Sequence, residues 1–158
     1  MAQKKCHVCK AEVAPGTLPE ISGQEGSLAV TVHHLPVLEC PNGHRLFANP
    51  DFPLLLLDRL VEQDAAKLPA STAKGLLIKH HHCASCGQRL ADSPDRQRTF
   101  HVDVELPEVA PFDVELTMPV HRCQACGYEQ VHSLKEVRSR APAALAHAFK
   151  DAAIAAPA

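Results

Sequence analysis

Apolar and polar residues alternate over one long stretch in the second half of the chain. In TFHVDVELPEVAPFDVELTMPVH (99–121), apolar residues recur at every second position on either side of a proline-bounded break. A period of two over this length predicts two half-buried strands joined by a turn at 107–111. The first half repeats the pattern in SLAVTVHHLPVLEC (27–40), with Leu28, Val30 and Val32 facing inward. The first strand of this half is less clear, because the preceding APGTLPEISGQEGS (14–27) is rich in turn residues.

A helical pattern follows the alternating segment in each half. NPDFPLLLLDRLVEQDAAKL (49–68) has prolines near its start, which a first helical turn tolerates. APAALAHAFKDAAIAAP (141–157) is rich in alanine and ends at a proline. The predicted buried faces are Leu54, Leu57 and Val61 in the first helix and Leu145, Phe149 and Ala152 in the second. We expect each helix to cover a sheet that is too small to bury itself.

Composition indicates that something other than a large core supports the fold. Only six aromatic residues are present, five Phe and one Tyr, so the rings that usually dominate a core are scarce. The seven cysteines and eleven histidines exceed what packing requires. The cysteines form three C-x-x-C pairs, and Cys40 is followed four residues later by His44.

These residues match the ligand sets of two structural zinc sites. Such a site takes four thiolate or imidazole ligands in a tetrahedron, supplied in pairs by tight turns. The predicted sets are Cys6, Cys9, Cys40 and His44 for one Zn²⁺, and Cys83, Cys86, Cys123 and Cys126 for a second. This assignment uses every cysteine. The remaining alternatives are buried apolar thiols, a redox C-x-x-C pair, or iron in the all-thiolate site.

Turn residues near the ligands support the assignment. Asn42 and Gly43 provide a permissive turn that lets Cys40 and His44 face one ion. Gly87 and Gly127 directly follow two of the C-x-x-C pairs, where a zinc knuckle turns sharply.

The ligand pairs also predict an internal repeat. A shift of 77 residues places Cys6 and Cys9 on Cys83 and Cys86, and a shift of 82 or 83 places His44 and Cys40 on Cys126 and Cys123. The predicted fold class is a small metal-stabilised α+β protein with two zinc-ribbon β-hairpin modules, each followed by a helix. The predicted domains are residues 1–67, a linker at 68–75, and residues 76–158. The apolar GLLI at 75–78 is expected to be buried.

Cysteine number and the start of the chain favour a reducing compartment. An odd cysteine count argues against a closed disulfide framework, and MAQKKCHVCK has no signal-peptide pattern. No apolar run reaches the length of a membrane span. We therefore expect a cytoplasmic protein with reduced thiols and no membrane partner.

The knuckles resemble known bacterial zinc-binding sequences. The apolar-Pro-apolar step into a knuckle, in HHLPVLECPNGH and LTMPVHRCQACGYEQ, resembles bacterial zinc-ribbon proteins of the YgiT type, the zinc-binding part of some antitoxins. CPNGHRLF is similar to the zinc finger of bacterial ribosomal-RNA guanine methyltransferases. The resemblance covers only the knuckles and adjoining strands, and it implies a metal-ligand role for the eight predicted ligands. The sequence has neither a helix-turn-helix pattern nor a glycine-rich turn for a methyl donor.

The first of three possible functions is a non-catalytic adaptor or scaffold that binds a protein partner, with zinc replacing the missing core. Leucines beyond the predicted buried stripe, namely Leu55, Leu56 or Leu60, would supply an apolar contact surface.

The second possible function is binding of RNA or DNA, which requires a basic face. The formal charge is −2, and seven thiolates with two Zn²⁺ lower it to −5. Aromatic residues that could stack on bases are few. The predicted contacts lie on the second module, at Arg89, Arg96, Arg98, Arg122, Arg138 and Arg140.

The third possible function is metal handling or catalysis with an additional metal at His80, His81 and His82. Three adjacent histidines on a strand cannot all face one ion, because successive side chains point to opposite faces. The eight predicted ligands fill both zinc sites and leave no position for a reactive water. We therefore predict no catalysis, and expect these histidines to be surface groups or groups that hydrogen-bond around the thiolates.

Overall fold

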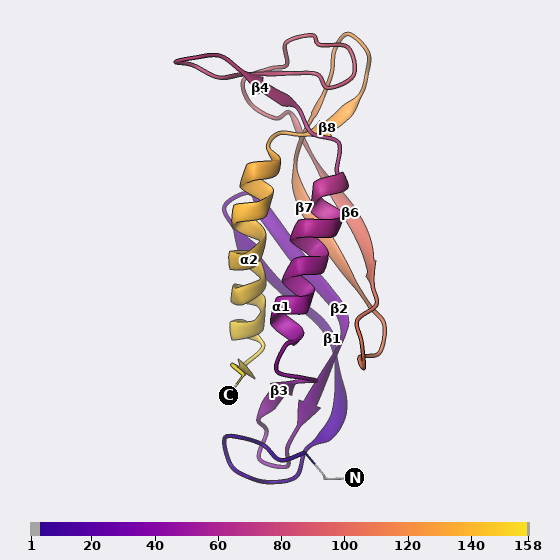
Figure 1. The fold of residues 1–158 in the computed structure, drawn as a ribbon, viewed down its shortest axis with the longest axis vertical. Helices are drawn as coiled ribbons and strands as arrows, with labels where there is room; N and C mark the ends of the chain where they lie inside the picture. The colour runs from indigo at the N-terminus through magenta and orange to yellow at the C-terminus, as the bar shows by residue number, and fades with distance from the viewer. Residues whose placement is uncertain (1–3, 158) are drawn as a thin grey trace.

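The computed structural model describes residues 4–157 (Figure 1). The chain combines nine strands with two α-helices within these residues. In order, the elements are β1 (Ala14–Glu25), β2 (Leu28–Glu39), β3 (Arg45–Phe47), α1 (Phe52–Leu57), the π-helix η1 (Asp58–Asp64), the 3-10 helix η2 (Ala65–Lys67), β4 (Thr72–Lys74), β5 (His80–His82), β6 (Arg96–Val104), β7 (Phe112–Arg122), β8 (Glu129–Val131), α2 (Leu134–Asp151) and β9 (Ile154–Ala155).

Most strands belong to one sheet that contains both halves of the chain. β1, β2, β7 and β6 lie side by side and are antiparallel, and β2 pairs with β7 from Ala29–Thr117 to His33–Asp113. The short strands β3 and β9 extend the sheet beside the end of β2, and β8 extends it beside the end of β7. The predicted hairpin of β6 and β7 is confirmed, with the turn between Val104 and Phe112.

β1 is a twelve-residue strand in the segment where the sequence left the first strand of the hairpin unclear. Within residues 4–157 it pairs only with β2, so it is an edge strand, where a proline can be accommodated. Pro19 lies at a break in the pairing, opposite His34, whose φ of 57° is positive. The local twist at His34 changes which residues of β2 face the core, from Leu28, Val30 and Val32 to Leu35 and Val37.

Both helical segments lie against one face of the sheet and enclose the main core with it (Figure 1). The predicted inward residues of β2 and β7 are buried there. The alternate residues of these strands face away from the helices. None of the helices within residues 4–157 is long and apolar enough to cross a membrane.

The buried face of the first helical segment differs from the predicted one. Phe52, Leu56 and Leu60 are buried, whereas Leu54 is 70% exposed. Phe52 anchors the segment because its ring packs on Phe47 and Phe112, with centroids 5.6 and 5.7 Å apart. The wider π-helical winding of η1 then continues the buried row to Ala65 at a spacing of four to five residues. The prediction that Leu56 and Leu60 form a contact surface is therefore wrong.

The second predicted helix is present as α2, but it begins seven residues before the predicted start at 141 and ends at Asp151, and residues 154–155 of the predicted segment form β9. Leu145 is buried, and Phe149 and Ala152 are partly buried. Its small residues Ala144 and Ala148 lie directly on β1. A Cβ added to Gly23 of β1 would collide with the backbone carbonyl of Ala144 and the amide of Ala148. The alanines of α2 and this glycine therefore bring the helix and the sheet into close contact.

Residues 68–75 are partly ordered by the sheet. The amide of Val131 in β8 donates to the Pro69 carbonyl, and the amide of Ser71 donates to the Val131 carbonyl. β4 then forms a hairpin with β5. The prediction that GLLI is buried is wrong, because Leu76 and Leu77 lie fully exposed at the tip of this hairpin.

Candidate metal centres

The four predicted ligands of the first set lie together. Their donor atoms all lie within 4.8 Å of one another. Cys9 Sγ is 3.7 Å from Cys40 Sγ, and His44 Nδ1 is 3.3 Å from Cys40 Sγ and 3.7 Å from Cys6 Sγ. Around a tetrahedral ion, two sulfurs would lie about 3.8 Å apart and a sulfur and a nitrogen about 3.5 Å. The first set therefore has the spacing needed to hold a metal ion.

The second set has the same spacing with four thiols. Cys83 Sγ is 3.6 Å from Cys126 Sγ, and Cys86 Sγ is 3.6 Å from Cys123 Sγ. All four sulfurs lie within 4.8 Å, and all seven cysteines are free thiols. The two sets occupy opposite ends of the elongated molecule, beside β3 and β8 (Figure 1).

Each C-x-x-C pair is shaped by the same two backbone hydrogen bonds. The amides of Cys83 and Gly87 bond to the carbonyls of Gln88 and Cys83, and the Cys123 knuckle repeats both bonds. Gly87 and Gly127 have φ values of 79° and 76°, which glycine adopts without strain. In the first knuckle the equivalent position is Lys10, whose φ is 65°. The first knuckle therefore has a lysine in the left-handed conformation at the position where the other two knuckles have glycine.

Replacing Lys10 with glycine is expected to stabilise the protein. The left-handed conformation costs a residue with a Cβ about 1–2 kcal/mol, so Lys10→Gly should raise the unfolding free energy by about 1 kcal/mol. Chemical denaturation of the metal-bound protein measures this change. Gly127→Lys is the matched reverse substitution and should lower the unfolding free energy by a similar amount. If Lys10→Gly were less stable than the parent protein, backbone strain at Lys10 would not be the cause.

Two amide side chains that the sequence did not identify as site residues donate to ligand sulfurs. Asn42 Nδ2 lies 3.3 Å from Cys9 Sγ, and this hydrogen bond is the main cause that lowers the pKa of Cys9 to about 6. Gln130 Nε2 lies 3.3 Å from Cys83 Sγ, and its Oε1 accepts from the Ala84 amide at 2.8 Å. Burial raises the pKa of Cys83, but hydrogen bonds from the Cys86 backbone and Gln130 outweigh it and bring the pKa to about 6. Both contacts favour the thiolate that binds metal.

Gln130 is expected to control metal affinity at the second site. It is 1% exposed, so Gln130→Met keeps most of the buried volume while removing the hydrogen bonds of the Gln130 amide to Cys83 Sγ, the Ala84 amide and the Tyr128 carbonyl. Loss of such outer contacts commonly weakens metal binding about 10–100-fold. Competition with a chromophoric chelator measures the affinity at each site. Gln88→Met, on an exposed position of the same knuckle, is the control and should leave the affinity unchanged. Equal affinities in the two variants would exclude a role for Gln130.

Within residues 4–157, the three adjacent histidines hydrogen-bond to groups other than the thiolates. His80 Nδ1 accepts from Arg89 at 2.8 Å, and His82 Nδ1 lies 3.3 Å from the Gly87 carbonyl. His81 points to the other side of β5, where its Nδ1 lies 2.8 Å from Ser71 Oγ. Alternation along the strand separates them, so they form no common metal site.

His81 instead belongs to a stack with His121 and His132. The His81 and His132 ring centroids are 4.0 Å apart, and His121 Nε2 lies 2.6 Å from His132 Nδ1. Ser71 Oγ donates its one hydrogen to the His132 carbonyl. In the hydrogen bond between Ser71 and His81, His81 Nδ1 is therefore the donor and Ser71 Oγ the acceptor. Burial and the neighbouring His132 lower the pKa values of both His81 and His121. Within the stack, His81 and His121 therefore favour their neutral forms next to the second metal set.

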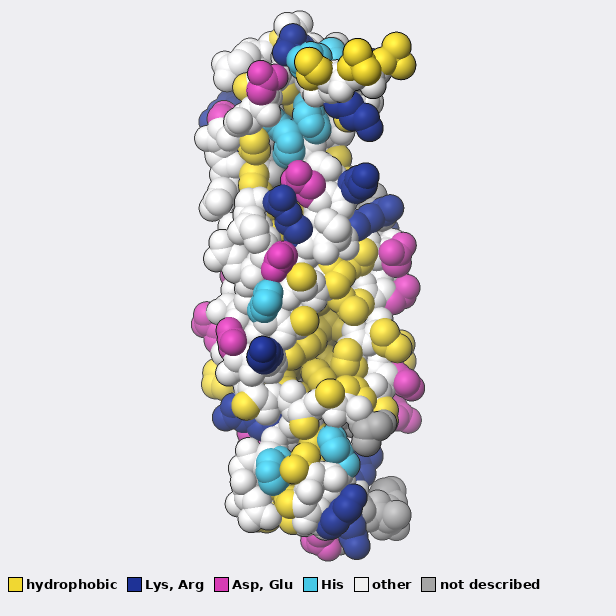
Figure 2. Space-filling view, turned by 90° about the vertical axis from the view of Figure 1, so that its left-hand side faces the viewer, with side chains coloured by type: hydrophobic (Ala, Val, Ile, Leu, Met, Phe, Trp, Pro, Cys, Tyr) yellow, Lys and Arg dark blue, Asp and Glu magenta, His cyan; other side chains and the backbone are white. Residues whose placement is uncertain are grey.

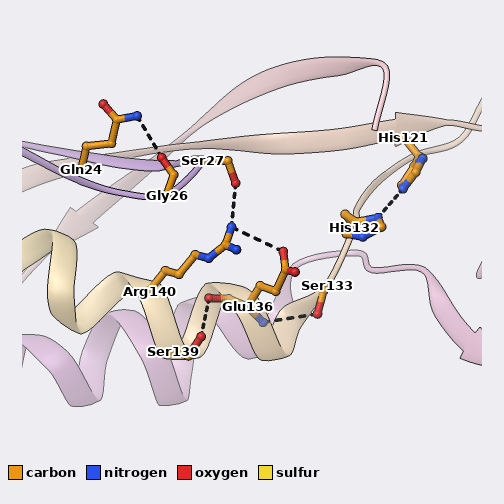
Figure 3. Close-up of polar contacts among 9 residues, drawn as sticks. All are labelled: Gln24, Gly26, Ser27, His121, His132, Ser133, Glu136, Ser139 and Arg140. Carbon is orange, nitrogen blue, oxygen red and sulfur yellow. Dashed lines mark hydrogen bonds and ion pairs between the residues drawn. The ribbon is translucent and has the colours of Figure 1, made fainter. Parts of the chain in front are cut away.

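A cavity of about 340 Å³ opens beside this stack, where α2 begins. Its apolar floor consists of Leu28, Met118, Val131 and Val137, and its polar rim includes His132, Glu136 and Arg140. Arg140 Nη1 donates to Ser27 Oγ at 2.8 Å and pairs with Glu136 at 3.6 Å (Figure 3). The Arg140 charge thus already ties α2 to the turn between β1 and β2.

The arginines predicted to contact nucleic acid have different surroundings. Three pair with acids: Arg89 with Asp92 at 3.4 Å, Arg96 with Asp95 at 3.7 Å, and Arg140 with Glu136. Arg98 lies over the Phe100 ring at 4.9 Å, and Arg138 is exposed on α2. Arg96 and Arg122 line a hollow of about 270 Å³ beside Cys123.

The arrangement gives each candidate ion four protein ligands and leaves no coordination position for a reacting water. This closed coordination is typical of structural rather than catalytic metal sites. Comparison with known protein families, curated proteins and solved structures finds no match to this chain.

Proposed function

We propose that this chain is a non-catalytic adaptor that binds a protein partner and is stabilised by two Zn²⁺. In this proposal the chain consists of two zinc-ribbon modules related to the YgiT type, with three cysteines and one histidine in the first site and four cysteines in the second. Closed coordination at both metal sets supports a structural role for zinc. Seven free thiols fit the reducing conditions of the cytoplasm.

The observation that carries the proposal is the apolar tip of the β4–β5 hairpin. Leu76, Leu77 and Ile78 are 102%, 99% and 72% exposed. Apolar side chains project at that end of the molecule in Figure 2. Consecutive large apolar side chains in water are unfavourable, and exposed apolar patches of this kind mark interaction sites. Burial against a partner would contribute about 1.5–3 kcal/mol for each side chain.

The residues around the tip fit a contact surface with a polar rim. Lys74 and Lys79 flank the three apolar residues in sequence. β4 and β5 form the hairpin that presents them, and β5 runs directly into the knuckle of Cys83. Zinc at the second site would therefore hold the base of the hairpin in place.

The adaptor proposal predicts that the tip captures a defined protein. A tagged chain is exposed to a lysate of its own cells, with and without nuclease, and the retained proteins are identified by mass spectrometry. The combined substitution Leu76→Ser, Leu77→Ser and Ile78→Ser should abolish capture. Leu54→Ser, which changes an exposed leucine of α1, is the matched control and should retain it. Unchanged capture by the triple variant would exclude the tip as the contact.

Nucleic-acid binding is the second candidate because Arg96 and Arg122 share one hollow beside the second metal set. The formal charge of −2 and the pairing of Arg96 with Asp95 count against it. The same experiment separates the two functions, since loss of all retained material after nuclease treatment would favour nucleic acid.

A further inference from the structure

The face of the sheet turned away from the helices carries two histidines and a glutamate that belong to neither cysteine set. His101 of β6 lies directly opposite Glu115 of β7. His33 of β2 lies opposite Asp113 of β7, which is two residues before Glu115. Alternation along the strands places these side chains on the face opposite the buried Val32 and Val114 and the partly buried Val102.

Both imidazoles approach the same carboxylate oxygen. His33 Nε2 lies 3.4 Å and His101 Nδ1 lies 3.5 Å from Glu115 Oε1. These separations exceed the usual 2.7–3.2 Å of a good hydrogen bond. They agree with the roughly 3.3 Å between neighbouring nitrogen and oxygen ligands of a tetrahedral ion bound at about 2.0–2.1 Å.

The surroundings of Glu115 also favour a bound cation. His33 Nε2 is buried and has no hydrogen-bond partner within residues 4–157. Asp103 and Asp113 lie directly opposite each other, which is unfavourable for two like charges. Of residues 29–33, 97–103 and 113–119, only Arg98 is basic, and it packs over Phe100 on the other face. A divalent ion would bind the unpartnered nitrogen and neutralise this acidic surface.

We propose that His33, His101 and Glu115 bind a third, exchangeable divalent transition-metal ion. Two imidazoles and one carboxylate suit Zn²⁺, Ni²⁺ or Cu²⁺, and three protein ligands leave coordination positions for water. Their donor atoms do not all lie within 4.8 Å of one another, as those of each cysteine set do, so the side chains must move closer together around an ion. The His101 side chain is 69% exposed, so rotation of its ring can bring the nitrogen onto the ion.

Such an ion would link the two halves of the chain. His33 comes from the first half, whereas His101 and Glu115 come from the second, and all three lie around the β2–β7 pairing that joins the halves. Binding of the third ion is therefore expected to stabilise the centre of the sheet, at a distance from both thiolate sites.

Calorimetric titration of Zn²⁺ into the intact protein, with two metal ions already bound, tests the proposal. We expect one further equivalent to bind, with at least tenfold weaker binding in His101→Gln and in Glu115→Gln. Both variants should keep the two thiolate-bound ions, as measured by elemental analysis, and the circular dichroism of the parent.

Two matched controls separate this site from other surface histidines. His147 Nε2 lies 2.9 Å from Glu25 Oε2, and these two residues offer only two ligand atoms to a metal ion. His147→Gln should therefore leave binding of the third Zn²⁺ equivalent unchanged. His80→Gln tests the three adjacent histidines and should also leave it unchanged. Absence of a third equivalent in the parent protein, its persistence in His101→Gln and Glu115→Gln, or its loss in His80→Gln would overturn the proposal.

Discussion

Removal of both metal ions by a strong chelator is expected to unfold the two ends of the molecule while the centre of the sheet keeps its structure. Each end has little apolar core of its own. The buried cluster at the first end consists of Cys6, Cys40 and Leu46, and the one at the second end of Cys83, Leu90 and Cys123. Two of the three residues in each of these buried clusters are therefore predicted metal ligands.

The magnitude of the effect follows from the free energy of metal binding. A structural zinc ion contributes about 10–16 kcal/mol in small zinc-binding peptides, where binding and folding are coupled. This value matches or exceeds the whole stability of a typical domain, about 5–15 kcal/mol. The knuckles cannot replace such a contribution by packing. The centre of the sheet has its own large core, which includes Val30, Val114, Leu116 and Leu145.

Hydrogen exchange before and after chelation measures this result residue by residue. The knuckle amides of Cys6, Cys83 and Cys123 should lose protection, and the amides that join β2 to β7 should keep it. Restoration of Zn²⁺ is the control and should return protection to the knuckles. Knuckle amides that remain protected in a completely metal-free protein would contradict a structural role for the ions.

The second large effect is expected at Gly23, where α2 approaches β1 most closely. A Cβ at this position would overlap the backbone of Ala144 and Ala148, and backbone atoms cannot move aside as a side chain can. Gly23→Ala should therefore push α2 away from the sheet and lower the unfolding free energy by about 3 kcal/mol, at the upper end of ordinary overpacking.

Gly16→Ala is the matched control on the same strand. Its added Cβ would meet only the flexible end of the Glu39 side chain, so the change should stay within about 0.5 kcal/mol. Neither glycine has a positive φ, so backbone strain does not distinguish them. Denaturation of both variants in the presence of metal measures the difference, and equal stabilities would show that the helix adjusts without cost.

The metal ligands could be predicted from sequence because their signal is local. Each C-x-x-C pair defines one turn, and the count of ligands forces the four pairs into two sets. The strands β2, β6 and β7 were predictable for a similar reason, since one buried face imposes alternation. β1 was unclear from the sequence because Pro15, Gly16, Pro19 and Gly23 are typical of turns. Its edge position and the close approach of α2 explain these residues.

Features that depend on long-range contacts could not be predicted in the same way. The pairing of β2 with β7 joins residues 80 to 88 positions apart in sequence, and no local pattern specifies it. The five consecutive apolar residues at 53–57 allow several buried faces, and the stacking of Phe52 on two other rings selects one. GLLI has the composition of a buried segment, but the β4–β5 hairpin holds it away from the core.

Zinc K-edge X-ray absorption of the purified protein, after dialysis against a weak chelator that removes loosely held ions, tests the central claim most directly. Two closed structural sites predict two zinc ions per chain and a first shell of seven sulfurs and one nitrogen in total, with zinc–sulfur distances of about 2.3 Å. Fewer than two ions per chain, or an oxygen ligand at either site, would contradict the conclusion that both metal centres are fully coordinated by the protein.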